Sequence, residues 1–457
     1  MKSAMLVLGL MALGCAAPSS STTLVAATTS LQAPDFPEEG ILRKKLPAPT
    51  TSVTVAGGGR YLVLHLAKQR NLAIFDVTQA KIVKYLPMGG DDLLIAGGQE
   101  HIVVVARDHK LIQRWDLSNF KKGLTLALDE PGLVDQLSMG YASVGPVMLV
   151  TRTGTRFYDP RTLKRIHYGE PNNLWASHPQ YPVQVRASAD GQAFTAWVPN
   201  ISPNGIRLLS LQGESYTTRS QHASAGYLLP SADGTLVLTS SGVYSQELVQ
   251  LNKDRFHGHR CLPALHPAYF VSLAGVGPYY GQTPKTNPVL NIHTTNDRQL
   301  LATLPDLEEL LGTFGRSVPI DQRVFFLPSA HLLITLPTTN DELVLRRVNL
   351  VELLKQSGVD YLFAESTPPR TAQAGKEYTY DIAVQSARGK VRLSLDNGPE
   401  DMKLRRNRLT WKVPANQKPG PASIILTLSD ASGQEVFHSY TLKVINDNYQ
   451  EPAPDQE

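Results

Sequence analysis

Short apolar strands that end in a polar turn residue recur along the first three quarters of the chain. The clearest copies are Ala73–Asp76, Gln113–Asp116 and Arg156–Asp159. Weaker copies follow at Leu208–Ser210, Val249–Asn252, Leu290–His293 and Arg347–Asn349. Neighbouring copies end 40 to 56 residues apart. Each copy therefore marks the same position in a structural unit of similar size, and seven copies predict seven units.

Each unit carries the signals of several short strands. Gly-containing turns such as Gly57–Arg60, Asp190–Gly191 and Asp233–Gly234 separate one apolar strand from the next. Asp-Gly between two apolar runs favours a tight hairpin, because glycine accepts the positive φ of the turn. Helical periodicity is found at Leu307–Gly312 and Leu350–Gly358. A period near 40–50 residues with about four strands per unit predicts an all-β fold, a seven-bladed β-propeller.

The last unit lacks a fourth strand, because the chain turns helical after Asn349. A matching strand is found near the N-terminus, where Leu42–Pro47 is similar to Ile82–Pro87 and Leu300–Pro305. We expect this N-terminal strand to complete the last sheet, which closes the ring and leaves no free sheet edge. The propeller is predicted at residues 39–348, followed by a helical linker at 349–366.

The strand ends resemble those of WD40 and YVTN-type propellers over residues 38–358. Gln113–Asp116 contains the Trp-Asp pair of that family, whereas the regular Gly-His before each blade is absent. The resemblance implies the propeller architecture. It does not imply one activity, because propellers serve in binding, scaffolding and catalysis alike.

A second domain is predicted at residues 367–446, and it begins with the Pro-rich hinge Thr367–Arg370. Alternating strands are expected at 377–384, 391–395, 408–413, 423–428 and 440–444. This spacing predicts a small β-sandwich. Trp411 alternates in phase with Leu409 and Val413, so we expect it in the sandwich core.

Four segments of this domain, Ala374–Tyr380, Leu395–Met402, Leu409–Trp411 and Ser429–Gly433, resemble the bacterial Ig-like and dystroglycan-type cadherin-like domains. The resemblance implies extracytoplasmic adhesion, spacing or partner contact. Cadherin repeats bind calcium through clustered acids, but only Asp430 and Asn446–Asp447 hint at such ligands here.

The N-terminus is predicted to be a secretory signal, at residues 1–17. Lys2 precedes the apolar stretch Ala4–Gly14, which is too short to span a bilayer as a helix. Ala12–Cys15 is similar to a bacterial lipobox, in which Cys15 would carry lipid. Cleavage after Ala16 or Ala17, or a retained anchor, are the alternatives. Residues 18–38 are predicted to be a flexible tether, and residues 447–457 a disordered acidic tail.

The composition bears on the size of the core, on disulfide bonds and on the kind of partner. The 457 residues are 42% hydrophobic, which suffices for a large core. Cys15 and Cys261 are the two cysteines, so a lipidated Cys15 leaves Cys261 without a disulfide partner. The net charge of +4 is too small for a nucleic-acid protein of this length, and no nucleic-acid partner is predicted.

One cluster has residues that zinc or copper prefers. His257, His259 and Cys261 alternate along the chain and would share one face of a strand. The alternative is a connection between blades with two exposed histidines and one buried cysteine, and no cofactor is predicted.

Two regions are candidates for partner contact. Tyr279 and Tyr280 lie in a Gly- and Pro-rich insertion, and a second insertion covers residues 199–205. They form a contact surface if they project from one face, or are tolerated loop growth. Lys403, Arg405 and Arg406 belong to a basic cluster that either meets anionic glycan or lipid, or is a solvated surface.

These features predict an exported, lipid-anchored binding or scaffold protein that contacts a protein or glycan partner in the periplasm or at the cell surface. The membrane contact would be the lipid on Cys15. The alternatives are a propeller enzyme of the lactonase or quinoprotein type, with a metal or cofactor in the central channel, and a purely structural envelope component. Carboxylates, Asn or His at a channel mouth would favour an enzyme. Small apolar residues and Ser/Thr would count against it.

Overall fold

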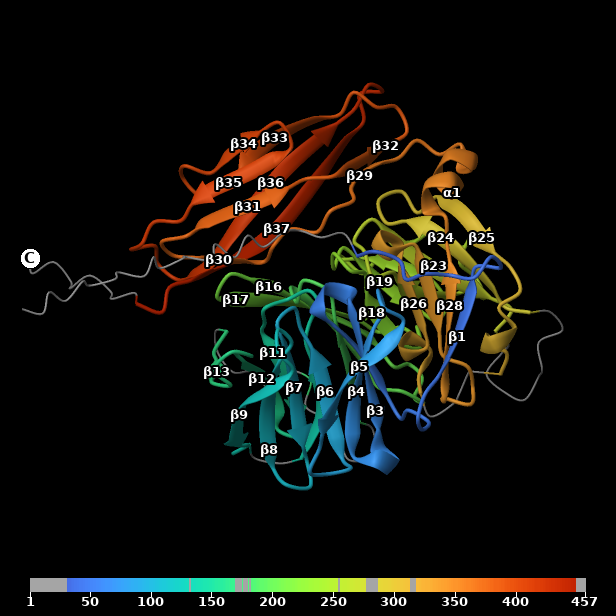
Figure 1. The fold of residues 1–457 in the computed structure, drawn as a ribbon, viewed down its shortest axis with the longest axis vertical. Helices are drawn as coiled ribbons and strands as arrows, with labels where there is room; N and C mark the ends of the chain where they lie inside the picture. The colour runs from blue at the N-terminus through green and yellow to red at the C-terminus, as the bar shows by residue number, and fades with distance from the viewer. Residues whose placement is uncertain are drawn as a thin grey trace, which may run out of the picture.

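The structure is a computed structural model, and it describes residues 31–130, 133–168, 175, 180, 182–253, 255–276, 287–312 and 318–448. Six four-stranded antiparallel sheets are each built from four consecutive strands (Figure 1). The first three contain β2 (Val53–Ala56), β3 (Tyr61–Leu66), β4 (Asn71–Asp76), β5 (Lys81–Pro87); β6 (Leu93–Gly97), β7 (His101–Ala106), β8 (Leu111–Asp116), β9 (Lys121–Ala127); β10 (Val134–Ser138), β11 (Val147–Thr151), β12 (Gly154–Tyr158) and β13 (Arg165–Ile166). The next three contain β14 (Gln184–Ala187), β15 (Ala193–Trp197), β16 (Ile206–Gln212), β17 (Ser215–Gln221); β18 (Leu228–Pro230), β19 (Leu236–Thr239), β20 (Val243–Ser245), β21 (Gln250–Leu251); β22 (Arg260–Pro263), β23 (Tyr269–Ala274), β24 (Val289–Thr294) and β25 (Leu300–Leu304).

A further sheet joins the two ends of this region. Its strands are β26 (Val324–Leu327), β27 (Leu332–Thr335), β28 (Glu342–Arg347) and β1 (Ile41–Lys45). β1 pairs antiparallel with β28, with Ile41 opposite Arg346 and Lys45 opposite Glu342. The pairing expected for the N-terminal strand is therefore present.

The sheets form a closed ring, which makes this region a β-propeller. The first strands of successive sheets contact one another from β2 through β6, β10, β14 and β18 to β22. The sheet that contains β26 closes the circle: the Leu265 amide donates to the Phe326 carbonyl at 2.7 Å, and the Val53 amide donates to Gln322 Oε1 at 3.1 Å. Short 3-10 turns η1 (Gly57–Gly59), η2 (Ala67–Gln69), η3 (Glu308–Leu310), η4 (Ile320–Gln322) and η5 (Pro328–Ala330) interrupt the connections.

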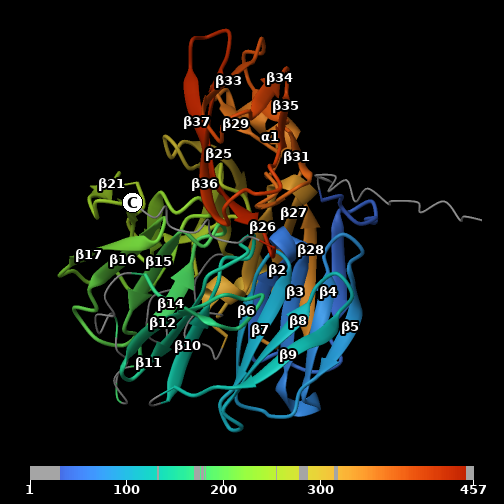
Figure 2. The ribbon, with the colours of Figure 1, turned by 90° about the vertical axis from the view of Figure 1, so that its left-hand side faces the viewer.

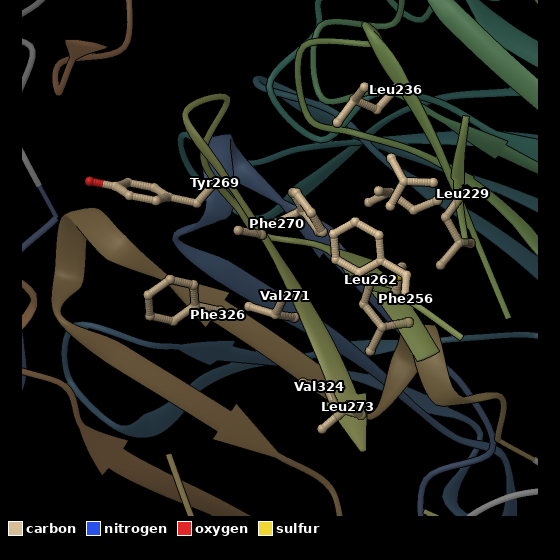
Figure 3. Close-up of a cluster of buried hydrophobic side chains, with 14 of the residues drawn as sticks. Leu229, Leu236, Phe256, Leu262, Tyr269, Phe270, Val271, Leu273, Val324 and Phe326 are labelled. Carbon is tan, nitrogen blue, oxygen red and sulfur yellow. The ribbon is translucent and has the colours of Figure 1, made fainter. Parts of the chain in front are cut away.

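The second strands of the sheets, such as β11, β15 and β27, are buried along their whole length, because neighbouring sheets cover both of their faces. Figure 3 shows one such contact, where Leu229 of β18, Phe270 of β23 and Phe326 of β26 belong to one buried cluster. The side chain of Tyr269 points away from the other labelled residues, and its ring lies 5.1 Å from that of Phe363 in the second domain. The same core therefore extends toward the second domain.

One predicted anchor was placed on the wrong strand. Val249–Asn252 overlaps β21, the fourth strand of its sheet, and not the third strand β20. β20 is only three residues long, so it offers little apolar signal. The other anchors overlap or directly follow the third strands β4, β8, β12, β16, β24 and β28.

Neighbouring sheets approach so closely at Gly140 that a side chain does not fit. A Cβ on Gly140 would lie 2.4 Å from both the Gly191 amide nitrogen and the Ser188 carbonyl oxygen. We expect Gly140→Ala to destabilise the protein by about 2 kcal/mol, because backbone atoms must move. Thermal denaturation measures this, with Gly89→Ala as the control, since nothing lies within 4 Å of a Cβ there. Equal melting temperatures for the two variants would contradict the prediction.

The helix α1 (Leu350–Ser357) links the propeller to the second domain, as the sequence predicts. The Asn349 side chain accepts from the Glu352 amide and caps the N-terminus, and Gly358 ends the helix at a φ of 66°. Leu350 and Leu354 are buried in the same cluster as Phe363. The helix is thus packed onto the propeller rather than free.

The second domain is also built from strands. They are β29 (Leu362–Ala364), β30 (Thr371–Gln373), β31 (Glu377–Asp381), β32 (Val384–Ser386), β33 (Arg392–Asn397), β34 (Lys403–Arg405), β35 (Arg408–Lys412), β36 (Gly420–Ser429) and β37 (Glu435–Ile445). A four-stranded sheet β30-β37-β36-β33 and a three-stranded sheet β31-β35-β34 enclose one core, and β29 pairs with β32. Trp411 is 2% exposed in this core together with Leu409 and Val413, which confirms the predicted anchor.

Candidate functional site: a central cavity with one covered mouth

The ring encloses a cavity of about 530 Å³. Its wall comes from the first strands of the sheets, β2, β6, β10, β14, β18, β22 and β26, and from the segments that precede and follow them. All sheets around the ring therefore contribute to this one space. A volume of this size accommodates a small ligand.

One end of the cavity is narrowed by the turns that follow these first strands. Backbone hydrogen bonds join the turns of neighbouring sheets: Gly57 donates to the Gly98 carbonyl at 2.8 Å, Ala142 to Ala189 at 2.9 Å, and Ala189 to Ala232 at 3.0 Å. The first strands thus all run toward this end. Residues early in each first strand lie at the opposite end, which we call the far mouth.

The second domain lies over the end with the joined turns, which we call the covered mouth (Figures 1 and 2). Lys443 Nζ lies 3.2 Å from Asp159 Oδ2, and Thr371 Oγ1 donates to Glu100 Oε1 at 3.3 Å. Asp159 follows a third strand and Glu100 precedes a second strand, so both belong to turns at this end. The second domain therefore touches several sheets of the ring.

A buried histidine connects the two domains. His266 lies between β22 and β23, and its Nε2 is 2.9 Å from the Glu365 carbonyl oxygen. Its Nδ1 accepts from the Ala268 amide at 3.1 Å, so Nε2 carries the proton and donates. Burial lowers the pKa of His266, which keeps the ring neutral.

Charged groups gather beside the covered mouth. Burial, followed by the charge of Asp190, raises the pKa of the Tyr141 hydroxyl, and the charge of Arg370 opposes this shift. Burial also raises the pKa of Asp233, whose carboxylate accepts from Ser231. The Arg370 guanidinium lies over the Tyr440 ring at 5.5 Å. One arginine of the second domain thus faces acidic turns of the propeller.

The far mouth has a different chemistry. Arg186 Nε donates to Asp321 Oδ2 at 2.5 Å, and this ion pair joins β14 to the η4 turn, two segments of separate sheets. Gln136, Gln184 and Gln322 line the same end of the cavity. Toward the covered mouth the wall becomes more apolar, with the small residues Ala96, Gly97, Ala187, Ala189 and Ala232 beside Met139, Tyr141 and Leu265.

The histidines at the domain interface predict an acid-sensitive fold. Burial, then the charges of Arg370 and His266, lower the pKa of His438 from 6.5 to about 3. The unfolded chain takes up this proton below about pH 6.5 and the folded chain does not, so stability is full above pH 6.5 and falls as the pH drops toward 3. We expect a loss of about 2 kcal/mol from His438 alone at about pH 5.

Thermal denaturation at pH 7.5 and pH 5 measures this effect. His438→Gln should show a smaller loss between the two pH values than the unchanged protein. His257→Gln is the control, because its side chain is exposed. The same pH dependence in both variants would contradict the assignment to His438.

The His257, His259 and Cys261 candidates have separate environments. His257 is exposed, whereas His259 Nδ1 lies 3.1 Å from Ser272 Oγ. Cys261 is fully buried in the core, and burial raises the pKa of its thiol. Among the described residues, no group of three or more His, Cys, Asp or Glu could hold a metal ion. His257 and Cys261 have the exposure that the alternative of a connection between sheets expects, whereas His259 is half-buried rather than exposed.

Several other predicted residues lie outside the described part of the chain. Cys15, the signal segment, Tyr279 and Tyr280 are among them. Within the predicted tether, residues 31–38 are described, and Leu31 and Phe36 pack against the core of the first and last sheets. The Arg347 guanidinium lies over the Phe36 ring at 5.1 Å.

Lys403, Arg405 and Arg406 are exposed on the β34–β35 hairpin of the second domain. Arg408, on the partner strand, is held by Asp381 through two hydrogen bonds of 2.5 and 2.9 Å. The hairpin lies on the side of the second domain away from the propeller (Figure 1). These basic residues therefore lie on a different part of the molecule from the cavity.

The calcium candidates are engaged in other contacts. Asp430 accepts from Ser386 and Ser432, and Asn446 donates to the carbonyls of Ala415 and Gln417. In the part of the chain that the structure describes, no helix is long and apolar enough to cross a membrane.

No protein-family model matches the chain, and neither does any curated protein sequence. Solved structures are similar in fold. The Cps50 (Swd1) β-propeller domain of Myceliophteria thermophila is 10% identical, with 67% of this chain and 100% of that chain covered and a TM-score of 0.42. A chain of the Mitotic Checkpoint Complex is 14% identical, with 75% and 99% covered and a TM-score of 0.46. Raptor of Chaetomium thermophilum is 9% identical, with 70% and 29% covered and a TM-score of 0.45.

The chain contains a β-propeller. At identities of 14% or less and TM-scores below 0.5, these likenesses carry no argument about function, and the assignment of the fold rests on the ring of sheets itself. The residues of the cavity and the domain interface are therefore the basis for a functional proposal.

Proposed function

We propose that the protein is an exported, non-enzymatic binding or scaffold protein that contacts a protein or glycan partner through the far face of its propeller. In this proposal the propeller has seven blades closed by β1, and the second domain is an Ig-like sandwich. The lipobox-like Ala12–Cys15 supports a lipid anchor at Cys15 and a place in the periplasm or at the cell surface.

The observation that carries this proposal is the unequal use of the two mouths. The second domain covers one mouth with Lys443, Thr371 and the carbonyl of Glu365, so a partner has less access to that face. The loops of the far face lie at the end of the propeller opposite the second domain. The insertion at residues 199–205 joins β15 to β16 at this end, and β23 ends and β24 begins at the same end.

The wall of the cavity favours binding over catalysis. Among the described residues that line it, Asp321 is the one carboxylate, and Arg186 neutralises it. Threonine, serine, glutamine and Tyr141 supply the other hydrogen-bonding groups, and burial raises the pKa of the Tyr141 hydroxyl. No histidine is among these described lining residues. A general acid or base would need a titratable group that is free to exchange a proton.

Site-specific photocrosslinking in the native host tests the partner surface. A photoreactive amino acid at Ile201, which is 37% exposed on the far face, should give a discrete crosslinked species. The control position is Leu126, 40% exposed on the outer strand β9, and it should give none. Crosslinks of equal yield at both positions would contradict the proposal, and so would the absence of crosslinks at both positions.

The lipid anchor has its own test. Metabolic labelling with an alkynyl fatty acid should label the unchanged protein and not Cys15→Ser. The Cys15→Ser variant should also leave the membrane fraction. Labelling that persists in Cys15→Ser would contradict acylation at this position.

A further inference from the structure

We propose that the far mouth binds an uncharged amphiphile, whose hydroxylated head meets the polar residues of the mouth while its apolar tail enters the cavity. The inference rests on the proposed function, because it uses the same face of the propeller. It goes further by naming the chemistry of one ligand.

The far mouth presents hydrogen-bonding groups that the protein itself does not use. We call Gln136, Gln184, Arg186, Asp321 and Gln322 the polar rim. In the described part of the chain, no protein group bonds to the side-chain amides of Gln136 and Gln184. The Arg186 guanidinium donates through Nε to Asp321 and through Nη1 to the Val185 carbonyl, and no described residue accepts from its Nη2. Gln322 uses its Oε1 for the Val53 amide, which leaves its NH₂ group.

These free groups include both donors and acceptors. A glutamine amide offers an oxygen and two N–H groups, and the second oxygen of Asp321 accepts. A hydroxyl group is both a donor and an acceptor, so a head with several hydroxyls can pair with the donors and with the acceptors of the rim.

The charge of the rim selects against ionic heads. Arg186 and Asp321 cancel each other at 2.5 Å, and their side chains are only 22% and 10% exposed. A carboxylate ligand that accepts from Arg186 Nη2 would lie beside the Asp321 carboxylate, and an ammonium ligand that donates to the second oxygen of Asp321 would lie beside the Arg186 guanidinium. Either ligand would therefore bring a like charge against one member of a partly buried ion pair, which is unfavourable.

The interior beyond the rim suits an apolar tail. Ile95, Leu137, Leu229, Leu262 and Phe325 line it, and the small residues Ala187, Ala189 and Ala232 leave room near the covered mouth. The joined turns and the second domain lie at that end, so the tail would enter from the far mouth. A molecule with a tail and no polar head would leave the rim unsatisfied.

Calorimetric titration of the purified full chain with four probes tests the inference. Octyl glucoside has the tail and the neutral hydroxylated head, octanoate and octyltrimethylammonium have the tail with a charged head, and glucose has the head alone. All are used below their micelle concentrations. We expect octyl glucoside to bind with one-to-one stoichiometry, the two charged probes to bind at least about tenfold more weakly, and glucose to give no signal.

Two variants locate the site. Ala187→Trp fills the cavity and should abolish binding of octyl glucoside. Gln184→Ala removes one free amide of the rim and should weaken binding about fivefold. Gln212→Ala is the matched control, because Gln212 is exposed at the end of β16 and does not line the cavity, and it should bind as the unchanged protein does.

Equal binding of octyl glucoside to Ala187→Trp and to the unchanged protein would overturn the inference, as would equal affinity for the charged probes or no binding at all. If Ala187→Trp does not fold, the comparison of Gln184→Ala with Gln212→Ala still tests whether octyl glucoside binds at the polar rim. Equal affinity of these two variants would overturn the inference. Crosslinking at Ile201 without probe binding would refute the ligand and leave the partner proposal intact. Binding of octyl glucoside without that crosslink would support the ligand and contradict the partner proposal.

Discussion

Deleting residues 1–45 is expected to abolish cooperative folding of the propeller. The deletion removes β1, whose five residues all pair with β28. Arg43 also lies 3.1 Å from Glu342, and Leu42 packs on the core of the last sheet. At about 1 kcal/mol for each net hydrogen bond, the loss is about 5 kcal/mol or more, comparable with the whole stability of many domains.

The matched control is a chain that lacks residues 1–30 and keeps β1. It should melt as the unchanged protein does in thermal denaturation followed by circular dichroism. The shorter chain should aggregate or lose its sharp transition, because β28 becomes a free edge strand. A sharp transition at the same temperature in both chains would show that β1 does not hold the ring together.

Replacing Arg323 by methionine is expected to be the most destabilising single substitution considered for this protein. Arg323 is fully buried, and its guanidinium donates to the carbonyls of Val318 at 2.8 Å, Leu336 at 3.1 Å and Pro337 at 2.8 Å. Methionine fills part of the volume and donates to none of them. Leaving three buried carbonyls without this donor costs about 4 kcal/mol.

Arg219→Met serves as the control, because Arg219 is exposed on β17. Its free energy of unfolding should change by less than about 0.5 kcal/mol. Chemical denaturation with urea measures both variants. If the two substitutions had similar effects, the carbonyl contacts of Arg323 would not be important for stability.

The sequence predicted the fold where strand and turn signals coincide. Ala73–Asp76 and Gln113–Asp116 are apolar strands that end in aspartate, and they form most of β4 and β8. Trp411 was placed correctly because its alternation with Leu409 is the direct mark of a strand with one buried face. Val249–Asn252 was misplaced because the three residues of β20 carry too little pattern to identify it.

The features of the candidate site were less accessible to sequence reasoning. Arg186 and Asp321 are 135 residues apart, so no local pattern links them. Arg323 would ordinarily be assigned to the surface, because arginine is seldom fully buried. His266 and Glu365 are 99 residues apart and belong to different domains, so tertiary packing brings them together. Pairing across a ring of sheets is a tertiary property that spacing along one chain does not encode.

The antiparallel pairing of β1 with β28 also determines how the molecule would respond to mechanical force. The N-terminal end of β1 lies beside the C-terminal end of β28, since Ile41 is opposite Arg346. A pull between the N-terminus and the second domain therefore loads one residue pair at a time and peels the strand, whereas a shearing pull would load all pairs together. If the chain is held at a membrane by its N-terminus while a partner pulls on the second domain, β1 is the first element to yield, and the ring opens at that point.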